Sequence, residues 1–343
     1  MRRGWRYALI VGVFLMASGA AAVVWFGMRS LDEPVQLAEP LRFKVPSGAR
    51  FARVAAELAA QGVIVNPRAW VFYARWSHLA SAVKAGEYEI QPGTTPRELL
   101  TKMVNGQVLL HSFTIIDGWR VQDMLAALRR NPDIISILGD AAPNLMDKLG
   151  LPGVDPEGQF LPETYRFIAN TTDIELLRQA HAALTKELDA AWMGRDPGLP
   201  LRDSRELLIM ASIVEKESGL PQELGLIAGL YLHRLSIGMR LQADPTVIYG
   251  LGDRYDGDIR TVDLRTDGPY NTYTRVGLPP TPIALAGAAA IRATARPQRT
   301  DAIYLVASPK GDGSHVFSPT LEKHNAAVAS YLTHQRQKAA GVK

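Results

Sequence analysis

The sequence contains no cysteine, which excludes disulfide bonds and thiolate metal ligands. Its seven histidines form no HExxH motif and no pair at ligand spacing with a carboxylate. His111, His233, His315 and His324 each stand alone. We therefore expect neither a metal nor a cofactor. Lysine and arginine form no block, and the net charge is only +4, so we do not expect a nucleic-acid partner.

What the chain does have is length and a long apolar segment near its start. It comprises 343 residues, 47% of them apolar, which is enough for two or more domains. Tyr7–Met28 is a run of 22 residues without a charge, preceded by three arginines and closely followed by acids. Such a run can cross a bilayer as a helix, with residues 1–6 in the cytoplasm and the rest of the chain outside it. The alternative is a signal peptide cleaved near "ASGAAA", but the apolar run continues past those residues and favours an uncleaved anchor.

An internal repeat follows residues 29–40, which contain two prolines, lack periodicity and are predicted to be a linker. The repeat consists of "VPSGARFARVAAEL", "IQPGTTPRELLTKM" and "IIDGWRVQDMLAAL". In each copy a β-branched residue precedes Gly48, Gly93 or Gly118 by three positions, and apolar residues follow that glycine at plus six and plus ten. This pattern predicts a strand, a glycine turn and a short amphipathic helix. We expect the three units to pack side by side, although their unequal spacing excludes a solenoid.

The rest of the chain mixes helical and strand patterns without a regular alternation. We predict helices at 173–192, 223–236 and 321–332 and a buried strand at 302–308. This mixture favours the α+β class.

The segment "MASIVEKESG" places two acids, Glu215 and Glu217, at the end of an apolar run. A capping pattern at residues 203–204 predicts that this run is helical. The two acids then lie about 200° apart on the helix. Glu217 falls on the apolar stripe, which consists of Met210, Ile213 and Val214. A carboxyl there is either a general acid whose pKa is raised by desolvation or a partner in a structural ion pair, and the helix alone leaves both open.

Four longer motifs extend this observation. "MASIVEKES", "GMRLQADPTVIYGLG", "YNTYTRVGLPPTPIALAG" and "HVFSPTLEKHN" together resemble the MltG (YceG-like) family, the endolytic lytic transglycosylases of bacterial cell walls. The resemblance implies a membrane anchor, a LysM-like glycan-binding module at residues 41–109 and a mixed α+β catalytic domain at residues 110–343. The family's essential glutamate, in the pattern EKE[ST], corresponds to Glu217.

The resemblance also implies the activity and its surroundings. The family cleaves peptidoglycan between N-acetylmuramic acid and N-acetylglucosamine, leaves a 1,6-anhydro end and so ends strand growth. It implies glycan strands and the inner membrane as partners, with peptidoglycan synthases as further candidates, and a catalytic domain in the periplasm.

Other polar residues in the motifs are candidate site residues. Asp244 is a possible second catalytic carboxylate, but because it precedes Pro245 it is also expected to cap a helix. Gln242, Asn271 and Tyr273 are candidates for substrate contact, because amides and phenols can hold acetamido and hydroxyl groups. For Asn271 a turn-forming role stays open.

Two rival functions remain. Glycosidases generally need two carboxylates, whereas a lytic transglycosylase uses the sugar's own C6 hydroxyl, so that one glutamate suffices. A muramidase that hydrolyses the same bond, with Asp244 activating water, is one alternative. A non-enzymatic wall-binding anchor is the other.

Overall fold

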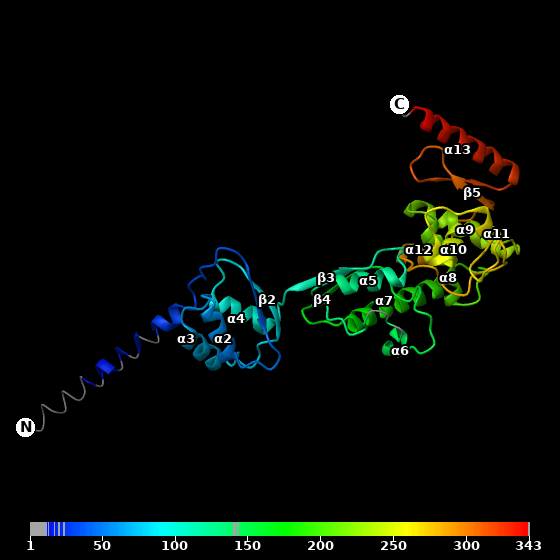
Figure 1. Cartoon of the computed structure of the whole chain (residues 1–343). Coiled ribbons are helices and arrows are strands. Elements are labelled where there is room, and N and C mark those ends of the chain that lie inside the picture. Colours follow the sequence, from blue (N-terminus) through cyan, green and yellow to red (C-terminus); the bar gives the residue numbers. More distant parts are fainter. Residues whose placement is uncertain are drawn as a thin grey trace, which may run out of the picture. The chain divides into compact units, whose positions relative to one another are not determined.

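A computed structural model describes residues 25–139, 142 and 144–341, and at the N-terminal end residues 12, 14–16, 18, 19, 21 and 22. The predicted membrane segment Tyr7–Met28 lies largely outside the described residues. Within the described part of the chain, no helix is both long and apolar enough to cross a membrane. The chain forms two compact units (Figure 1). The first consists of the described residues up to His111 together with Arg166–Asn170, and the second consists of Ser112–Tyr165 and the described residues from Thr171 onward.

The first unit packs three helices with a two-stranded antiparallel sheet. The strands are β1 (Leu41–Val45) and β2 (Gly86–Ile90), and Phe43 lies opposite Tyr88. The helices are α2 (Phe51–Ala60), α3 (Pro67–Trp76) and α4 (Pro96–Asn105). The core of this unit contains the apolar side chains that the helices and strands turn inward, among them Leu58, Trp70, Tyr88, Ile90 and Met103.

The predicted strand–turn–helix repeat is confirmed as local structure. Gly48, Gly93 and Gly118 have φ values of 72°, 85° and 74°, in the left-handed region that glycine adopts readily. The third copy comprises β3 (Leu110–Thr114) and α5 (Val121–Arg130). The first two copies share the core of the first unit, but α5 belongs to the second unit, so the expected packing of all three together is wrong.

The predicted linker, residues 29–40, contains neither a helix nor a strand from residue 30 onward. It is nevertheless packed against the first unit. Leu31 and Val35 are 1% and 6% exposed and lie in the core of the first unit. The Val35 amide donates to the carbonyl of Thr94 at 2.9 Å. Apolar residues without periodicity thus pack as irregular structure.

The second unit is built around one buried helix, α8 (Ser204–Glu217). Four further helices contact α8: α7 (Asp173–Met193), α9 (Leu224–Ser236), α10 (Asp244–Leu251) and α12 (Ala288–Ala295). Short helices α6 (Leu145–Leu149), η1 (Pro221–Glu223), η2 (Gly252–Arg254) and α11 (Thr261–Arg265) lie in the connections. The predicted helices at 173–192 and 223–236 are confirmed.

The C-terminal part of this unit is a hairpin followed by a long helix. β5 (Tyr304–Ala307) pairs antiparallel with β6 (His315–Ser318), and α13 (Leu321–Gly341) follows. The strand predicted as buried is half-buried, because this sheet has only two strands. A third pair joins β3 to β4 (Thr164–Ile168). Small sheets among many helices confirm the mixed α+β class.

Candidate active site

Glu217 is the last residue of α8, a helix that is capped at its start. At the start, the Asp203 side chain accepts a hydrogen bond from the Glu206 amide at 2.8 Å, which confirms the predicted cap. Residues 207–214 are buried on all sides of the helix. After Glu217 the chain becomes extended at Ser218, so the carboxyl projects from the point where the helix ends.

Glu217 faces polar and charged side chains from three other elements. The Tyr231 hydroxyl on α9 is close enough to its carboxyl group to stabilise the carboxylate. Arg234 on α9, Asp244 on α10 and His315 on β6 are close enough to act on its charge. Its Oε2 atom is buried and has no hydrogen-bond partner among the described residues. A buried carboxyl oxygen without a partner is unusual and marks a place for a polar group that the protein itself does not supply.

Burial is the main cause that raises the pKa of Glu217 above its usual range, and the negative charge of Asp244 raises it further. The Tyr231 hydroxyl and the charges of His315 and Arg234 act in the opposite direction. The neutral acid is therefore favoured at rest, while a hydroxyl and two basic groups are in place to stabilise the carboxylate once the proton has left.

Asp244 does not cap α10, contrary to the expectation from its position before Pro245. The helix begins at Asp244 without a side-chain capping bond. Its Oδ1 instead accepts a hydrogen bond from the Tyr273 hydroxyl. Burial raises the pKa of Tyr273, and the hydrogen bond to Asp244 raises it further, so this phenol remains a donor. Glu217, Asp244 and Tyr273 are thus brought into one neighbourhood.

The chain around Asn271 holds Tyr273 in place. The side-chain amide of Asn271 donates through Nδ2 to the carbonyls of Asp263, Leu264 and Thr266 at 2.7–3.2 Å. Its Oδ1 accepts from the Tyr273 amide at 2.8 Å. Asn271 is buried and its polar atoms are bonded to the backbone, which favours the alternative left open for this residue, the shaping of a turn. Substrate contact by Asn271 stays a prediction.

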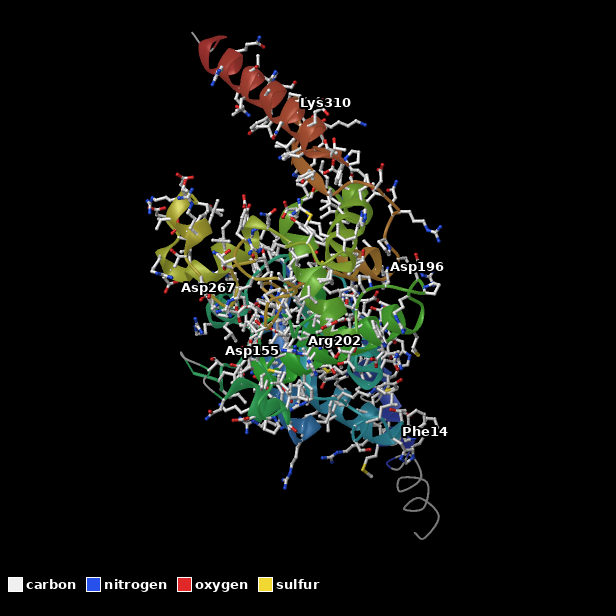
Figure 2. All side chains as sticks on the ribbon, turned by 90° about the vertical axis from the view of Figure 1, so that its right-hand side faces the viewer. Phe14, Asp155, Asp196, Arg202, Asp267 and Lys310 are labelled. Carbon is white, nitrogen blue, oxygen red and sulfur yellow. The ribbon has the colours of Figure 1, made fainter. Side chains whose placement is uncertain are left out.

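An ion pair and two further hydrogen bonds shape this loop. Asp267, labelled in Figure 2, pairs with Arg275 at 2.8 Å and accepts from Thr274 at the same distance. Gln242 is exposed and has a positive φ of 50°, and its amide donates to the carbonyl of Thr272 at 3.1 Å. The backbone before α10 is thereby tied to the loop that carries Tyr273.

Arg234 and Glu223 are the buried charged residues behind the site. Arg234 donates to the carbonyls of Ile303, at 2.5 Å, and Leu241. Glu223 binds His315 twice, at 2.7 Å to Nδ1 and at 2.8 Å to the main-chain amide. These bonds attach the C-terminal hairpin to the helices that surround Glu217.

A model of the YceG-like family matches residues 43–330. The chain belongs to the YceG-like family. The Endolytic murein transglycosylase of Bacillus subtilis is 29% identical over 330 residues, which cover 90% of this chain and 90% of that protein. The Endolytic murein transglycosylase of Streptococcus pneumoniae serotype 2 is 25% identical over 323 residues, 84% of this chain and 58% of that protein.

The chain is also similar to a solved structure. The crystal structure of a protein described as YceG-like, from Listeria monocytogenes, is 26% identical, with a TM-score of 0.48, over 84% of this chain and 99% of that one. The resemblance inferred from the four motifs is confirmed by the family match.

Glu215 has an environment of its own in this YceG-like chain. Its Oε2 accepts a hydrogen bond from the Gly287 amide at 3.0 Å, at the N-terminus of α12. A Cβ at Gly287 would lie 2.3 Å from Oδ1 of Asp117, so two carboxyl groups converge on this glycine. Burial raises the pKa of both Glu215 and Asp117. Since α8 is buried on all sides, the contrast between its faces does not by itself separate the two glutamates. Their neighbours do: Glu215 accepts from the Gly287 main chain beside Asp117, whereas Glu217 lies near Tyr231, Arg234, Asp244 and His315.

The sequence reasoning missed Glu223, Tyr231, Arg234 and His315. The sequence gives only a weak sign of Glu223, Tyr231 and Arg234. That sign is the position of Arg234 three residues after Tyr231 in a largely apolar helix. His315 is part of a motif that was identified, but it was judged to stand alone. It pairs with Glu223, and His111 likewise lies 3.0 Å from a carboxylate oxygen of Glu87. No group of three His, Asp or Glu side chains in the described ranges is arranged to hold a metal.

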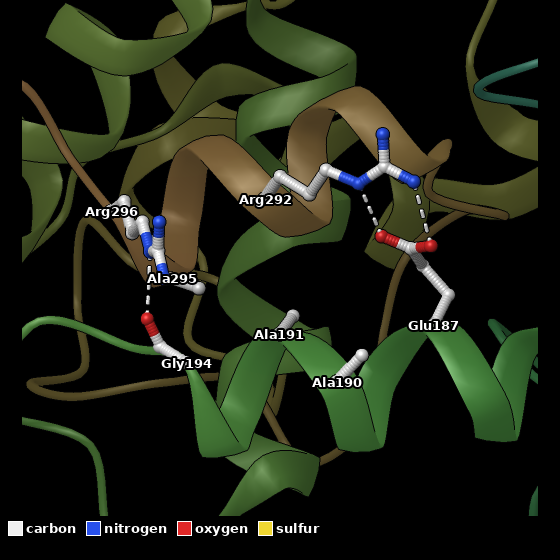
Figure 3. Close-up of a pocket in the computed structure, with 7 residues that line it drawn as sticks. All are labelled: Glu187, Ala190, Ala191, Gly194, Arg292, Ala295 and Arg296. Carbon is white, nitrogen blue, oxygen red and sulfur yellow. Dashed lines mark hydrogen bonds and ion pairs between the residues drawn. The ribbon is translucent and has the colours of Figure 1, made fainter.

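A pocket of about 290 Å³ lies between α7 and α12 (Figure 3) and contains none of the predicted site residues. Arg292 pairs with Glu187 through two hydrogen bonds of 2.6 and 2.8 Å on one side. On the other side Arg296 donates to the carbonyl of Gly194 at 2.7 Å. Each arginine is thus engaged in joining the two helices, and we assign this pocket a structural role.

Proposed function

We propose that this chain is an endolytic lytic transglycosylase that cleaves peptidoglycan glycan strands between N-acetylmuramic acid and N-acetylglucosamine. Membership of the YceG-like family and two relatives named endolytic murein transglycosylase support this assignment. The observation that carries it in the structure is the carboxyl of Glu217, whose Oε2 atom is buried and has no hydrogen-bond partner among the described residues. Burial raises the pKa of this carboxyl, while Tyr231, His315 and Arg234 act to lower it.

In the first step Glu217 acts as the general acid. Its raised pKa keeps a proton on the carboxyl near neutrality, and that proton passes to the oxygen of the departing N-acetylglucosamine as the bond from C1 of N-acetylmuramic acid breaks. The carboxylate that forms is stabilised by the Tyr231 hydroxyl and by the positive charge of Arg234. Asp244, whose Oδ1 is held by Tyr273, supplies a negative charge for the positive charge that develops on the sugar ring.

In the second step Glu217 acts as the general base. The C6 hydroxyl of the same N-acetylmuramic acid loses its proton to the carboxylate as its oxygen bonds to C1, which yields the 1,6-anhydro ring and restores the acid. Because this nucleophile is tethered to the reacting sugar, no second carboxylate is needed to activate water. Gln242 and Tyr273 remain our candidates for contact with the substrate.

We further propose that Tyr7–Met28 anchors the chain in the inner membrane, with the catalytic unit in the periplasm and residues 41–109 as a LysM-like module that binds glycan. The charge-free segment and the arginines before it support the anchor. The strand–turn–helix units support the module. Protease added to spheroplasts should digest the chain beyond the anchor, and full protection there would contradict this topology. Peptidoglycan synthases are the expected partners, because a strand must be released from the enzyme that extends it.

Product mass tests the reaction class. Purified glycan strands digested by the chain should give fragments that end in the 1,6-anhydro sugar. The nearness of Asp244 to Glu217 favours a muramidase as the second candidate, and its fragments would each be heavier by one water. A folded chain that cuts no strand would instead support the non-enzymatic anchor.

A further inference from the structure

Helix α3 of the first unit has two opposite aromatic faces. Trp70 and Ala74 are fully buried, and the Trp70 indole donates to the carbonyl of Pro96 at 2.9 Å. Phe72 and Trp76 point the other way, two positions further along the helix in each case, and are 58% and 68% exposed. The outer rings therefore take no part in the core that the inner face completes.

The outer face is basic as well as aromatic. Arg68, Phe72 and Trp76 follow one another at spacings of four, and Arg75 lies between them, so the four side chains form one exposed stripe. The sequence contains no acidic residue from Leu58 to Gly86. We call Arg68, Phe72, Arg75 and Trp76 the outer stripe of α3.

The first turn of α3 contacts the end of the apolar N-terminal segment. Gly27 lies so close to Ala69 that a Cβ at position 27 would be 3.2 Å from the Ala69 Cβ. Trp25 and Phe26, which are helical like Gly27, are 56% and 66% exposed. If Tyr7–Met28 spans a bilayer, Gly27 lies at its outer interface, and every residue of the ten-residue α3 lies within about 15 Å of that point.

We propose that the outer stripe of α3 docks on the surface of an anionic phospholipid bilayer, next to the anchor. The inference rests on the anchor in the proposed function. Tryptophan is enriched at membrane interfaces, and helices that combine basic and aromatic side chains bind anionic lipid through apolar burial and charge attraction. Arg68 and Arg75 are placed for headgroup phosphates, while the rings of Phe72 and Trp76 enter the boundary with the acyl chains.

Other occupants fit this stripe less well. Sugar sites combine aromatic rings with amides or carboxylates that hold hydroxyl groups, and the stripe has neither. The nearest amide, Asn66, is used as the cap of α3, where its Oδ1 accepts from the Ala69 amide at 3.2 Å. A second copy would bring two positively charged faces together.

Because the chain has no cysteine, one introduced cysteine can report on this surface in the full chain. We would label Trp76→Cys with an environment-sensitive NBD dye, so that the dye takes the place of the indole, and reconstitute the protein in phosphatidylcholine vesicles with or without equimolar phosphatidylglycerol. Thr101→Cys, at an exposed position on α4, is the matched control. Circular dichroism checks that each variant is folded.

We expect the emission of the dye at position 76 to shift to the blue and to be quenched by a quencher attached to lipid headgroups. Both effects should be larger in the anionic vesicles and should be lost when Arg68→Gln and Arg75→Gln are added. The dye at position 101 should report water throughout. Identical aqueous emission at both positions would overturn the proposal. So would a shift that requires added glycan strands, or one that follows protein density rather than lipid charge. Extraction of the protein by alkaline carbonate reports separately on the anchor. If the chain is extracted, the anchor fails, and the same dye, read after vesicles are added to the chain, still decides whether the stripe binds lipid.

Discussion

The Tyr231 hydroxyl provides a direct test of how the site controls Glu217. Tyr231 is 1% exposed, so Tyr231→Phe keeps the packing of the ring and removes the hydroxyl that stabilises the Glu217 carboxylate. A hydrogen bond to a charged group is worth about 1.5–3 kcal/mol. One decade in a protonation equilibrium corresponds to about 1.36 kcal/mol, so the balance between acid and carboxylate should change by roughly ten- to one-hundredfold.

The sign follows from which form the hydroxyl stabilises. Tyr231 favours the carboxylate, so its loss raises the pKa of Glu217 further. Activity falls at high pH where the general acid loses its proton, and we expect this limb of the kcat/KM profile to move upward by about one to two pH units. The plateau should also fall, because the carboxylate formed after proton donation is less stable.

The assay is release of anhydro products across pH, with Tyr165→Phe as the matched control. Tyr165 is also buried, and its hydroxyl donates to the carbonyl of Leu161 at 2.7 Å rather than to Glu217. A folded Tyr231→Phe variant with an unmoved limb, or with one displaced to lower pH, would refute the reasoning.

Three further predictions concern stability and the surroundings of the site. Glu217→Gln should be more stable than the wild type at neutral pH. The pKa of Glu217 is higher in the folded than in the unfolded chain, so the wild type loses stability as the pH rises through this interval. Below about pH 4 both states of the wild type are protonated, and the melting curves of the two proteins should coincide. Asn271→Ala should lower the free energy of unfolding by about 1–3 kcal/mol in urea titrations, because buried carbonyls lose their donor; an unchanged midpoint would exclude its structural role. Glu223→Gln should reduce kcat/KM about tenfold or more, because the hydrogen bonds that hold His315 lose their charge; wild-type kinetics would show that His315 does not act on Glu217.

Local structure was largely predictable from the sequence. The glycine turns at Gly48, Gly93 and Gly118 and the cap at Asp203 are determined by residues a few positions apart, and each was confirmed. The irregular segment with Leu31 and Val35 was misjudged, because burial without secondary structure leaves no periodic pattern.

The site was predictable only in part, for a physical reason. Glu217 was selected by its place beside Met210, Ile213 and Val214 and by the EKE[ST] pattern of the family, although α8 is buried on all sides and its faces alone do not separate the two acids. Its partners come from α9, α10 and β6, and no local pattern shows that His315 reaches the environment of a residue almost one hundred positions earlier. The sequence left the role of Asn271 open between substrate contact and a turn. Its side-chain bonds to three carbonyls form only when its own loop folds back, so no local pattern could reveal them.

The most direct test of the account compares two acids, two positions apart on α8, in one assay. Glu217→Gln and Glu215→Gln would each be incubated with purified glycan strands, and the products weighed by mass spectrometry, with circular dichroism to confirm folding. Glu217→Gln should lose activity by about 10⁴-fold or more, because the amide can neither give nor retake a proton. Glu215→Gln should keep substantial activity, since an amide oxygen can still accept from the Gly287 amide. The wild type should yield only anhydro ends. An active Glu217→Gln beside an inactive Glu215→Gln, or wild-type products heavier by one water, would contradict the central claim.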